Sequence, residues 1–279
     1  AFHKPFMLML KEKGYEIHAA ASSSSGRMEE VQALGVHCWD IPFARSPYSF
    51  SNCKAYRMLK ELFISHRFEL VHLHTPVAAF LGRYLAKKTG QGTVIYTAHG
   101  FYFYKGAPFR NWLIYYPAER LAAQWTDYLV VMNGEDYEAG LGMGFIPNEN
   151  LFLINGIGVD LDYYNRPADE DLSIRGELGI GDNEIIVTCI AELNSNKNQK
   201  FLLEAWEILA NEAKQAHLFL VGDGQLKFSY EKYIKEKNIP RVHLLGYRRD
   251  VPAILAQSNV VVLVSKREGL PRCLLEAMA

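Results

Sequence analysis

The sequence predicts an α/β protein with two doubly wound domains, each built on a parallel sheet. Short β-branched and aliphatic runs alternate with longer amphipathic patterns along the whole chain, which is typical of repeated βαβ units. With 279 residues, the chain is longer than one typical domain. A polar stretch between residues 161 and 171 interrupts the alternation, so we expect a linker there.

The first half predicts strands and helices in strict alternation. Each expected strand is a short apolar run, and each expected helix has apolar residues at helical spacing. The strands are expected at residues 16–21, 36–39, 70–74, 93–97, 128–132 and 151–154, and the helices at 2–13, 28–34, 52–66, 78–89, 109–125 and 135–143. Gly14 and Gly35 stand where helix C-caps are expected, because glycine accepts positive φ without strain.

The second half repeats the alternation. Strands are expected at residues 185–191, 217–221, 242–245 and 260–264, and helices at 200–211, 226–236, 251–256 and from Pro271 onward. We place the first domain at residues 1–160, the linker at 161–183 and the second domain at 184–279. The chain opens on a helical pattern and stops on another, so we expect both ends to be cut, with the first strand missing and the second domain incomplete.

Composition excludes several classes of function. A net charge of −1 gives no reason to expect a nucleic-acid partner. The four cysteines are scattered and fit neither a disulfide framework nor a metal-ligand spacing, which favours free thiols in a reducing compartment. No apolar run approaches the length of a membrane-spanning helix. We therefore expect a cytoplasmic protein.

The most informative residues lie at the end of the sequence. Glu268 and Glu276 are separated by seven residues and follow the apolar run 260–264. In open α/β sheets, ligands bind beyond the carboxyl ends of strands, beside free amides at helix N-termini. Two carboxylates that accept hydrogen bonds, placed beside free amides, suit a ligand that carries both hydroxyls and phosphate. A nucleotide sugar is such a ligand.

At this point the chain resembles a known family. The string Glu-Gly-Leu-Pro-Arg-Cys-Leu-Leu-Glu-Ala-Met, residues 268–278, looks like the donor-site motif of retaining GT-B glycosyltransferases of family 4. The resemblance implies two Rossmann-like domains, transfer of a hexose-type sugar from a nucleoside diphosphate, expected to be UDP, to a hydroxyl acceptor with retention, and no required metal or other cofactor. Residues 191–199 and 97–108 are similar to segments of bacterial capsular and exopolysaccharide enzymes, whose acceptors are often lipid-linked.

The resemblance also assigns roles in the donor site. Glu268 would accept hydrogen bonds from donor-sugar hydroxyls, and Glu276 from ribose hydroxyls. Lys197 opens a predicted helix against the helix dipole, so the sequence offers no local reason for it, whereas a leaving diphosphate would supply one. The backbone amides of Gly269 and Leu270 would share this role.

One position departs from the family pattern. Glu192 stands where the family often has a phosphate-binding arginine, and Arg272 is a candidate to compensate for it.

Two further segments match parts of the family's nucleotide site. Gly222 and Gly224 follow a predicted strand, and their counterparts lie near the donor phosphates and sugar. Tyr247 and Arg248 follow Gly246 and would stack on, or hydrogen-bond with, the base. Asp250 is expected to cap the next helix.

Histidines gather at the ends of the first-half strands. His99 follows a strand and precedes a glycine, and the resemblance places it near the donor sugar and acceptor. A neutral imidazole there can hydrogen-bond a hydroxyl or accept a proton, whereas the alternative is a structural histidine bonded to backbone. His72 and His74 share one face of a strand, and we expect a polar wall rather than a metal site because no third ligand stands nearby.

The segment between residues 101 and 125 is unusually aromatic and carries interspersed basic residues. Such a mixture suits a membrane interface or a lipid-linked oligosaccharide acceptor, which would make the protein peripheral at the inner face of the cell membrane. The helical spacing of the residues between 112 and 119 is equally compatible with core packing. The residues expected to meet the membrane are Phe103, Lys105, Phe109, Arg110 and Trp112.

Two functions from other classes stay open. A nucleotide-sugar epimerase of GT-B shape would call for further catalytic carboxylates in the first domain, where the strand ends offer histidine and threonine instead. A noncatalytic nucleotide-sugar-binding protein is compatible with Glu192 in place of arginine.

Overall fold

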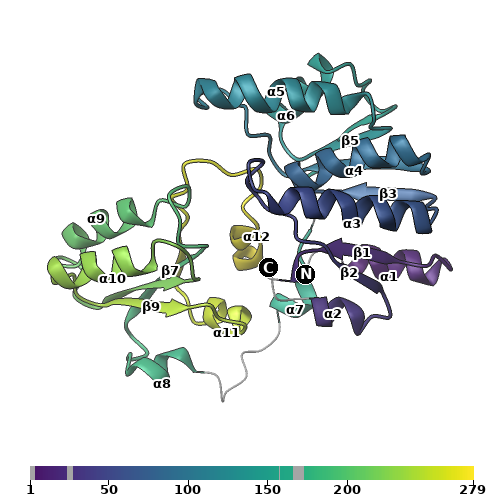
Figure 1. Cartoon of the computed structure of the whole chain (residues 1–279). Coiled ribbons are helices and arrows are strands. Elements are labelled where there is room, and N and C mark those ends of the chain that lie inside the picture. The colour runs from purple at the N-terminus through teal and green to yellow at the C-terminus, as the bar shows by residue number, and fades with distance from the viewer. Residues whose placement is uncertain (1–3, 24–27, 157, 166–172) are drawn as a thin grey trace. The chain divides into compact units, whose positions relative to one another are not determined.

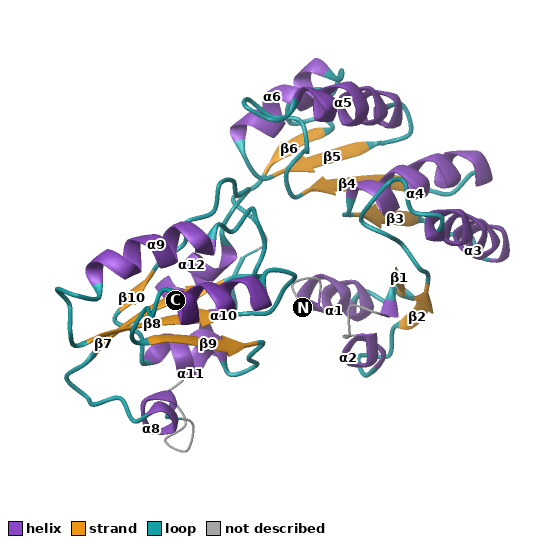
Figure 2. Ribbon diagram, turned by 60° about the vertical axis from the view of Figure 1, so that its left-hand side comes forward, coloured by secondary structure: helices purple, strands orange, loops and turns teal. Residues whose placement is uncertain are grey.

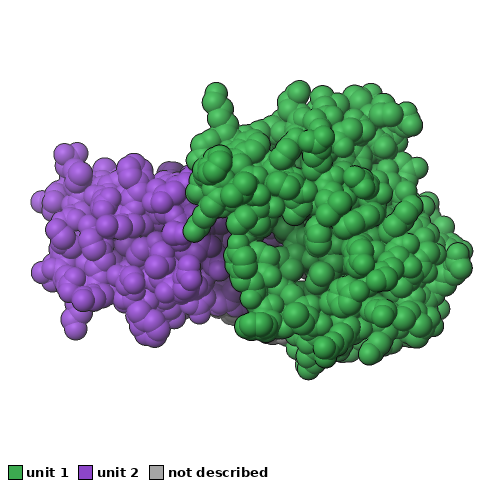
Figure 3. Space-filling model, turned by 45° about the horizontal axis from the view of Figure 1, so that its top comes forward, with its two compact units in different colours: residues 1–158 green, residues 159–279 purple. Residues whose placement is uncertain are grey.

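The computed structural model describes residues 4–23, 28–156, 158–165 and 173–279 (Figure 1). The chain forms two compact units, residues 1–158 and 159–279 (Figure 3). Both are α/β units with parallel strands, as the sequence predicts.

The first unit contains every strand and helix predicted for the first half. The strands are β1 (His18–Ala21), β2 (His37–Asp40), β3 (Leu70–Leu73), β4 (Thr93–Ala98), β5 (Tyr128–Val131) and β6 (Leu151–Leu153). The helices are α1 (Lys4–Glu12), α2 (Met28–Gln32), α3 (Ser51–Ser65), α4 (Pro76–Thr89), α5 (Phe109–Ala123) and α6 (Gly134–Gly142). Residues 2 and 3 of the first predicted helix lie outside the described residues. Gly14 and Gly35 have φ of +86° and +73°, as expected of C-caps.

The strands of the first unit form two separate parallel sheets (Figure 2). One has the order β3-β4-β5-β6 and the other is the pair β1-β2, in which His18 lies opposite His37. A cavity of about 1520 Å³ is lined by residues of both β1 and β3, together with residues of α1 and α3. Within the described residues, β1 pairs only with β2, and β3 pairs only with β4.

An ion pair lies inside the first unit between α4 and α5. Arg83 Nη2 is 2.7 Å from Glu119 Oε2, and the two side chains are 2% and 9% exposed. The guanidinium also lies 4.2 Å from the ring centroid of Tyr96 on β4. Burial raises the pKa of Glu119, while Arg83 opposes the shift. The pair thus connects two helices to the sheet at a place where both charges are almost fully buried.

The second unit has four strands and six helices among its described residues. They are α7 (Leu161–Tyr164), α8 (Ile174–Leu178), β7 (Ile185–Ile190), α9 (Gln199–Leu209), β8 (Ala216–Val221), α10 (Lys227–Glu236), β9 (Val242–Gly246), α11 (Val251–Ala256), β10 (Val260–Val261) and α12 (Arg272–Met278). β10 is shorter than predicted. Val262 still donates to Thr188 O at 2.9 Å, but β10 itself ends at Val261.

Two helices, α7 and α8, lie inside the span predicted as a linker, part of which (166–172) is outside the described residues. Each has about one turn, too short to show a helical period in the sequence. Their N-caps are ordinary: Asp160 accepts from Tyr163 N, and Ser173 from Gly176 N. Ile174 of α8 is 1% exposed and packs in the core of the second unit, so α8 is part of that unit.

The sheet of the second unit is covered on both faces. Leu218 and Leu220 of β8 pack in the core beneath α9, whereas Phe219 and Val221 pack in the core beneath α8 and α11. The strand order is β10-β7-β8-β9, so the order reverses between β7 and β10. At such a reversal the connections after the two strands leave toward opposite faces and open a crevice at the carboxyl ends.

We expect Arg83→Met to destabilise the first unit by about 3–5 kcal/mol, because Glu119 loses its cationic partner in a buried place. The double variant Arg83→Met/Glu119→Leu should recover most of this loss, since it leaves no buried charge. Urea denaturation of the three proteins tests the prediction. A single variant within about 1 kcal/mol of the parent would contradict it.

Candidate functional site

Two loops meet at the carboxyl edge of the second sheet, one after β7 and one after β10. Lys266 N donates to Asn196 O at 2.8 Å, and Asn196 Nδ2 donates to Arg267 O at 3.0 Å. Asn198 takes the left-handed conformation, with φ of +58°, immediately before α9. The loops that flank the strand-order reversal are therefore joined to each other by hydrogen bonds.

An ion pair crosses the same two loops. Lys197 Nζ is 2.6 Å from Glu268 Oε1, and the side chains are 24% and 22% exposed. The pair brings together two residues that the sequence predicts for one site. The sequence showed no local stabilising partner for Lys197 at the start of a helix. In the structure, Glu268 is that partner.

Glu276 lies on α12 with its side chain 13% exposed. Arg272 Nε is 2.8 Å from Glu276 Oε1, one helical turn away. Burial, together with the nearby Glu276 carboxylate, raises the pKa of Tyr164 on α7. Arg272, considered as a substitute for the arginine missing at Glu192, is thus engaged by Glu276.

Gly222 and Gly224 pack closely against the loop after β7. A Cβ on Gly222, whose φ is +142°, would lie 2.1 Å from the carbonyl oxygen of Ala191. A Cβ on Gly224 would lie 2.5 Å from the carbonyl oxygen of Leu193. Close packing within the unit therefore accounts for both glycines, and their contact with phosphates stays a prediction.

Arg248 is held by two carboxylates. It donates to Asp250 at 2.7 and 2.9 Å and to Glu177 of α8 at 3.1 Å. These bonds lower the pKa of Asp250 and raise that of Arg248. Asp250 stands at the N-cap position of α11, as the sequence predicts, but its side chain accepts from Arg248 and makes no bond to the amides of the helix. Tyr247 is 58% exposed, and contact of either residue with a base stays a prediction.

Gly269 and Leu270 lie in the bend between Glu268 and α12. Pro271 follows at the N-cap position with extended backbone, as the sequence predicts. Leu270 is 36% exposed. The place of their amides beside a diphosphate stays a prediction.

Three histidines lie together at the carboxyl ends of β3 and β4 in the first unit. His99 Nε2 is 3.3 Å from His74 Nδ1, and the rings of His72 and His74 have centroids 4.2 Å apart. His72 Nε2 also contacts Thr97 Oγ1 at 2.8 Å. Burial lowers the pKa of His99 and lowers that of His72 to about 4. The rings of His72 and His99 are therefore neutral near pH 7.

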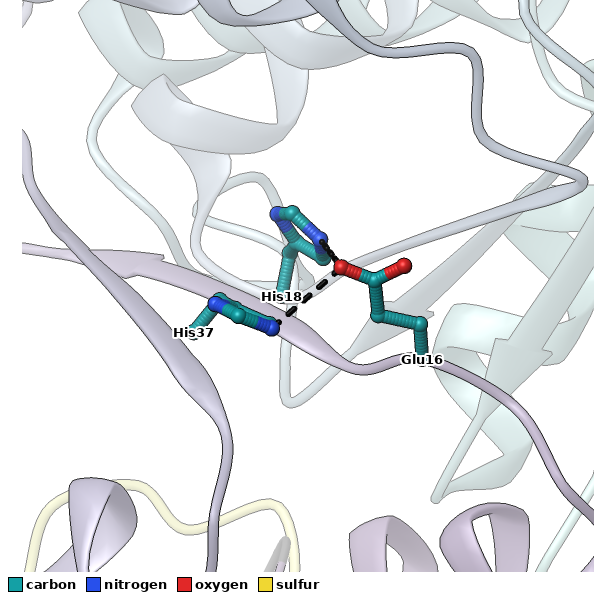
Figure 4. Close-up of side chains that lie close together, drawn as sticks. All are labelled: Glu16, His18 and His37. Atoms are coloured by element: carbon teal, nitrogen blue, oxygen red, sulfur yellow. Dashed lines mark hydrogen bonds and ion pairs between the residues drawn. The ribbon is translucent and has the colours of Figure 1, made fainter.

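A second cluster, which the sequence analysis missed, contains Glu16, His18 and His37 (Figure 4). Glu16 Oε1 lies 3.1 Å from His18 Nε2 and 3.2 Å from His37 Nε2, a spacing that three metal ligands could have. However, Trp39 Nε1 donates to His18 Nδ1 at 3.0 Å. That bond places the proton of a neutral His18 on Nε2, so this ring donates to Glu16 and offers no lone pair to a metal. The sequence carried one signal of this cluster. Glu16 and His18 are two residues apart in a predicted strand, so their side chains share one face.

Helix α5 exposes an apolar strip. Phe109 is 81% exposed, Leu113, one turn later, is 66% exposed, and Trp112 is 40% exposed. Lys105 and Arg110 are exposed in the same segment.

Phe103 does not belong to this strip. It is 2% exposed and packs against Phe101 and Tyr116, so its predicted role at a membrane is wrong. The aromatic segment therefore contributes some residues, such as Phe103, to the core and others, such as Phe109, to the surface. None of the described helices combines the length and the apolar content that crossing a membrane requires.

Comparisons with protein families agree for both halves. Residues 171–279 match the model described as glycosyl transferases group 1, and residues 1–133 match the model described as glycosyl transferase 4-like.

Individual proteins are similar over nearly the whole chain. A protein of Bacillus subtilis (strain 168) named as a glycosyltransferase, EpsD, is 36% identical over all of this chain and 73% of its own length. The UDP-Gal:alpha-D-GlcNAc-diphosphoundecaprenol alpha-1,3-galactosyltransferase of Escherichia coli is 32% identical over 97% of this chain and 71% of its own. The crystal structure of HepE from Anabaena, in complex with UDP and glucose, superposes with a TM-score of 0.69, 20% identity, and coverage of 94% of this chain and 70% of that one. That structure shows the GT-B fold.

The pKa of His72 makes the stability of the first unit depend on pH. The unfolded chain binds a proton near pH 6.5, whereas the folded ring binds one only near pH 4. Stability should thus be complete above pH 6.5 and fall as pH decreases toward 4, by at most about 1.4 kcal/mol per pH unit. In His72→Gln, this contribution to the pH dependence of the free energy of unfolding should disappear. Urea denaturation at several pH values measures it. An unchanged slope would show that His72 does not titrate in this way.

Proposed function

This chain belongs to the glycosyltransferases, and we propose that it transfers a hexose-type sugar from UDP to a hydroxyl acceptor with retention at the anomeric carbon. The observation that carries the proposal is the Lys197–Glu268 ion pair at the strand-order reversal of the second unit. That place is where α/β sheets bind nucleotides.

Lys197 is the residue that stabilises the leaving diphosphate. Negative charge grows on the β-phosphate as the bond to the sugar breaks, and a fixed cation nearby stabilises that charge. Glu268 holds Lys197 in place before the donor binds, so little reorganisation is needed at the moment of reaction. Because Lys197 and the loop amides supply the positive potential, the proposed reaction uses no resident metal ion.

The two carboxylates recognise the sugars of the donor. Glu268 accepts hydrogen bonds from hydroxyls of the transferred sugar, and Glu276 accepts them from the ribose. His99, in the first unit, hydrogen-bonds a hydroxyl of the donor sugar or the acceptor as a neutral imidazole. Retention follows from the resemblance of residues 268–278 to the family motif.

The relatives support transfer rather than epimerisation or simple binding. Both curated relatives reported above are named for glycosyl transfer, and the Escherichia coli protein is named for a UDP-linked donor and a diphosphoundecaprenol acceptor. We propose a lipid-linked acceptor for this chain as well, within the synthesis of a surface polysaccharide.

The exposed strip of α5 supports the membrane side of this proposal. Phe109, Trp112 and Leu113 offer apolar surface, and Lys105 and Arg110 lie in the same segment. Apolar side chains flanked by basic ones bind at the interface of an anionic bilayer. Such a contact would bring the protein to an acceptor whose lipid stays in the membrane.

The function is tested by UDP release from a panel of UDP-sugars with a lipid-linked acceptor. We expect Lys197→Ala to lower kcat by roughly 100-fold or more while changing donor affinity much less, because its charge acts mainly in the transition state. Lys200→Ala is the matched control, since that lysine is 64% exposed and pairs with Glu204 on the same helix. Equal turnover in the parent and Lys197→Ala would remove Lys197 from the mechanism.

Membrane binding is tested by co-sedimentation with anionic vesicles. Replacing Phe109 and Leu113 by serine should weaken binding by about tenfold or more, given the apolar area removed, and added salt should weaken the parent's binding. Phe228→Ser is the matched control, because Phe228 is equally exposed, at 81%, but lies in the second unit. If the control weakens binding as much as the double variant does, the α5 strip is not the contact.

A further inference from the structure

His74 and His99 are joined by a hydrogen bond to which the proposed function gives no role. Each follows the last residue of its strand, β3 for His74 and β4 for His99, and the two strands are neighbours in the parallel sheet. His74 Nδ1 lies 3.3 Å from His99 Nε2, and the ring centroids are 5.5 Å apart with planes inclined by 32°. Both residues are half-buried. His99 is therefore held from the neighbouring strand of its own unit.

His74 is itself packed against a ring that the sheet fixes. Its centroid lies 4.2 Å from that of His72, two residues earlier. His72 Nε2 is 2.8 Å from Oγ1 of Thr97, which is 5% exposed. Phe6 of α1 meets the His72 ring edge to face, with centroids 5.4 Å apart. The histidine that bonds His99 thus packs on a ring with its own hydrogen bond and its own aromatic contact.

The bond to His74 bears on the tautomer of His99. Burial lowers the pKa of His99, which keeps its ring neutral near pH 7. A neutral imidazole carries its proton on one nitrogen and a lone pair on the other, so one nitrogen donates and the other accepts. The role that Nε2 takes toward His74 therefore sets the opposite role for Nδ1 of the same ring. A bond that keeps one direction selects one tautomer and one ring orientation.

We propose that His74 is a positioning residue for glycosyl transfer: its Nδ1 holds His99 in the single tautomer and orientation that meets the hydroxyl of the donor sugar or the acceptor. The inference rests on the proposed function, which gives His99 that hydroxyl. Without His74, the ring of His99 would turn about its side-chain bonds and would present the wrong nitrogen for part of the time. The affinity for UDP, which the proposed function assigns to the second unit, would not change.

Nitrogen NMR of the imidazole rings tests the tautomer in the intact protein without ligands, because protonated and unprotonated ring nitrogens differ in chemical shift. The signals of His99 are assigned by their loss in His99→Ala. We expect one tautomer in the parent and a mixture in His74→Gln. His74→Asn should restore one tautomer, because its amide lies as many bonds from the backbone as Nδ1 does, whereas that of glutamine lies as far as Nε2. If His74 only filled space, both amides would serve equally.

Turnover of the same variants tests whether the tautomer matters for transfer. With the UDP-sugar and lipid-linked acceptor that the parent uses, His74→Gln should lower kcat by roughly three- to tenfold, as loss of one ordinary hydrogen bond does. Its calorimetric affinity for UDP should equal that of the parent, and His74→Asn should keep most of the parent's turnover. His37→Gln is the matched control, because that side chain is 60% exposed and belongs to the Glu16 cluster of the same unit.

The outcomes separate the inference from the proposed function. A single tautomer of His99 in His74→Gln, or equal effects of His74→Gln and His74→Asn, would overturn the inference and leave the proposed function standing. The parent's kcat in His74→Gln, together with lost activity in His99→Ala, would do the same. Equal turnover in the parent and His99→Ala would instead overturn the role of His99, and the inference with it.

Discussion

The ion pair between Lys197 and Glu268 is the interaction on which the candidate site depends. Both side chains are about three-quarters buried, so each needs a partner of opposite charge. The pair lies where the loops after β7 and β10 exchange hydrogen bonds. Removing either charge would leave the other uncompensated and loosen the crevice at which a nucleotide would bind. The two residues are therefore needed both for the fold of these loops and for the proposed site.

The surroundings of the pair keep the loops close to one backbone geometry. Gly222 and Gly224 admit the carbonyls of the loop after β7 at distances that any side chain would prevent. Gln199, fully buried at the start of α9, donates to Glu192 O at 3.0 Å. Glu192 therefore takes part in the loop through its backbone carbonyl.

The sequence predicted the described strands and long helices well, because alternation of short apolar runs with amphipathic ones is a local signal. It missed α7 and α8, which have about one turn each and are defined by the caps Asp160 and Ser173. It also missed contacts between distant residues. Glu177 holds Arg248, and Glu268 holds Lys197, each across 71 positions. Phe103 is buried and Phe109 is exposed, and this difference depends on such packing, so the aromatic composition of the segment did not predict it.

If a nucleoside diphosphate binds at the crevice between the ends of β7 and β10, it should protect the backbone amides of the two loops there. Hydrogen–deuterium exchange of the protein with and without UDP measures this protection residue by residue. We expect slower exchange with UDP in residues 191–199 and 264–276. Unchanged exchange in both segments at saturating UDP, or protection confined to the first unit, would show that the nucleotide does not bind there.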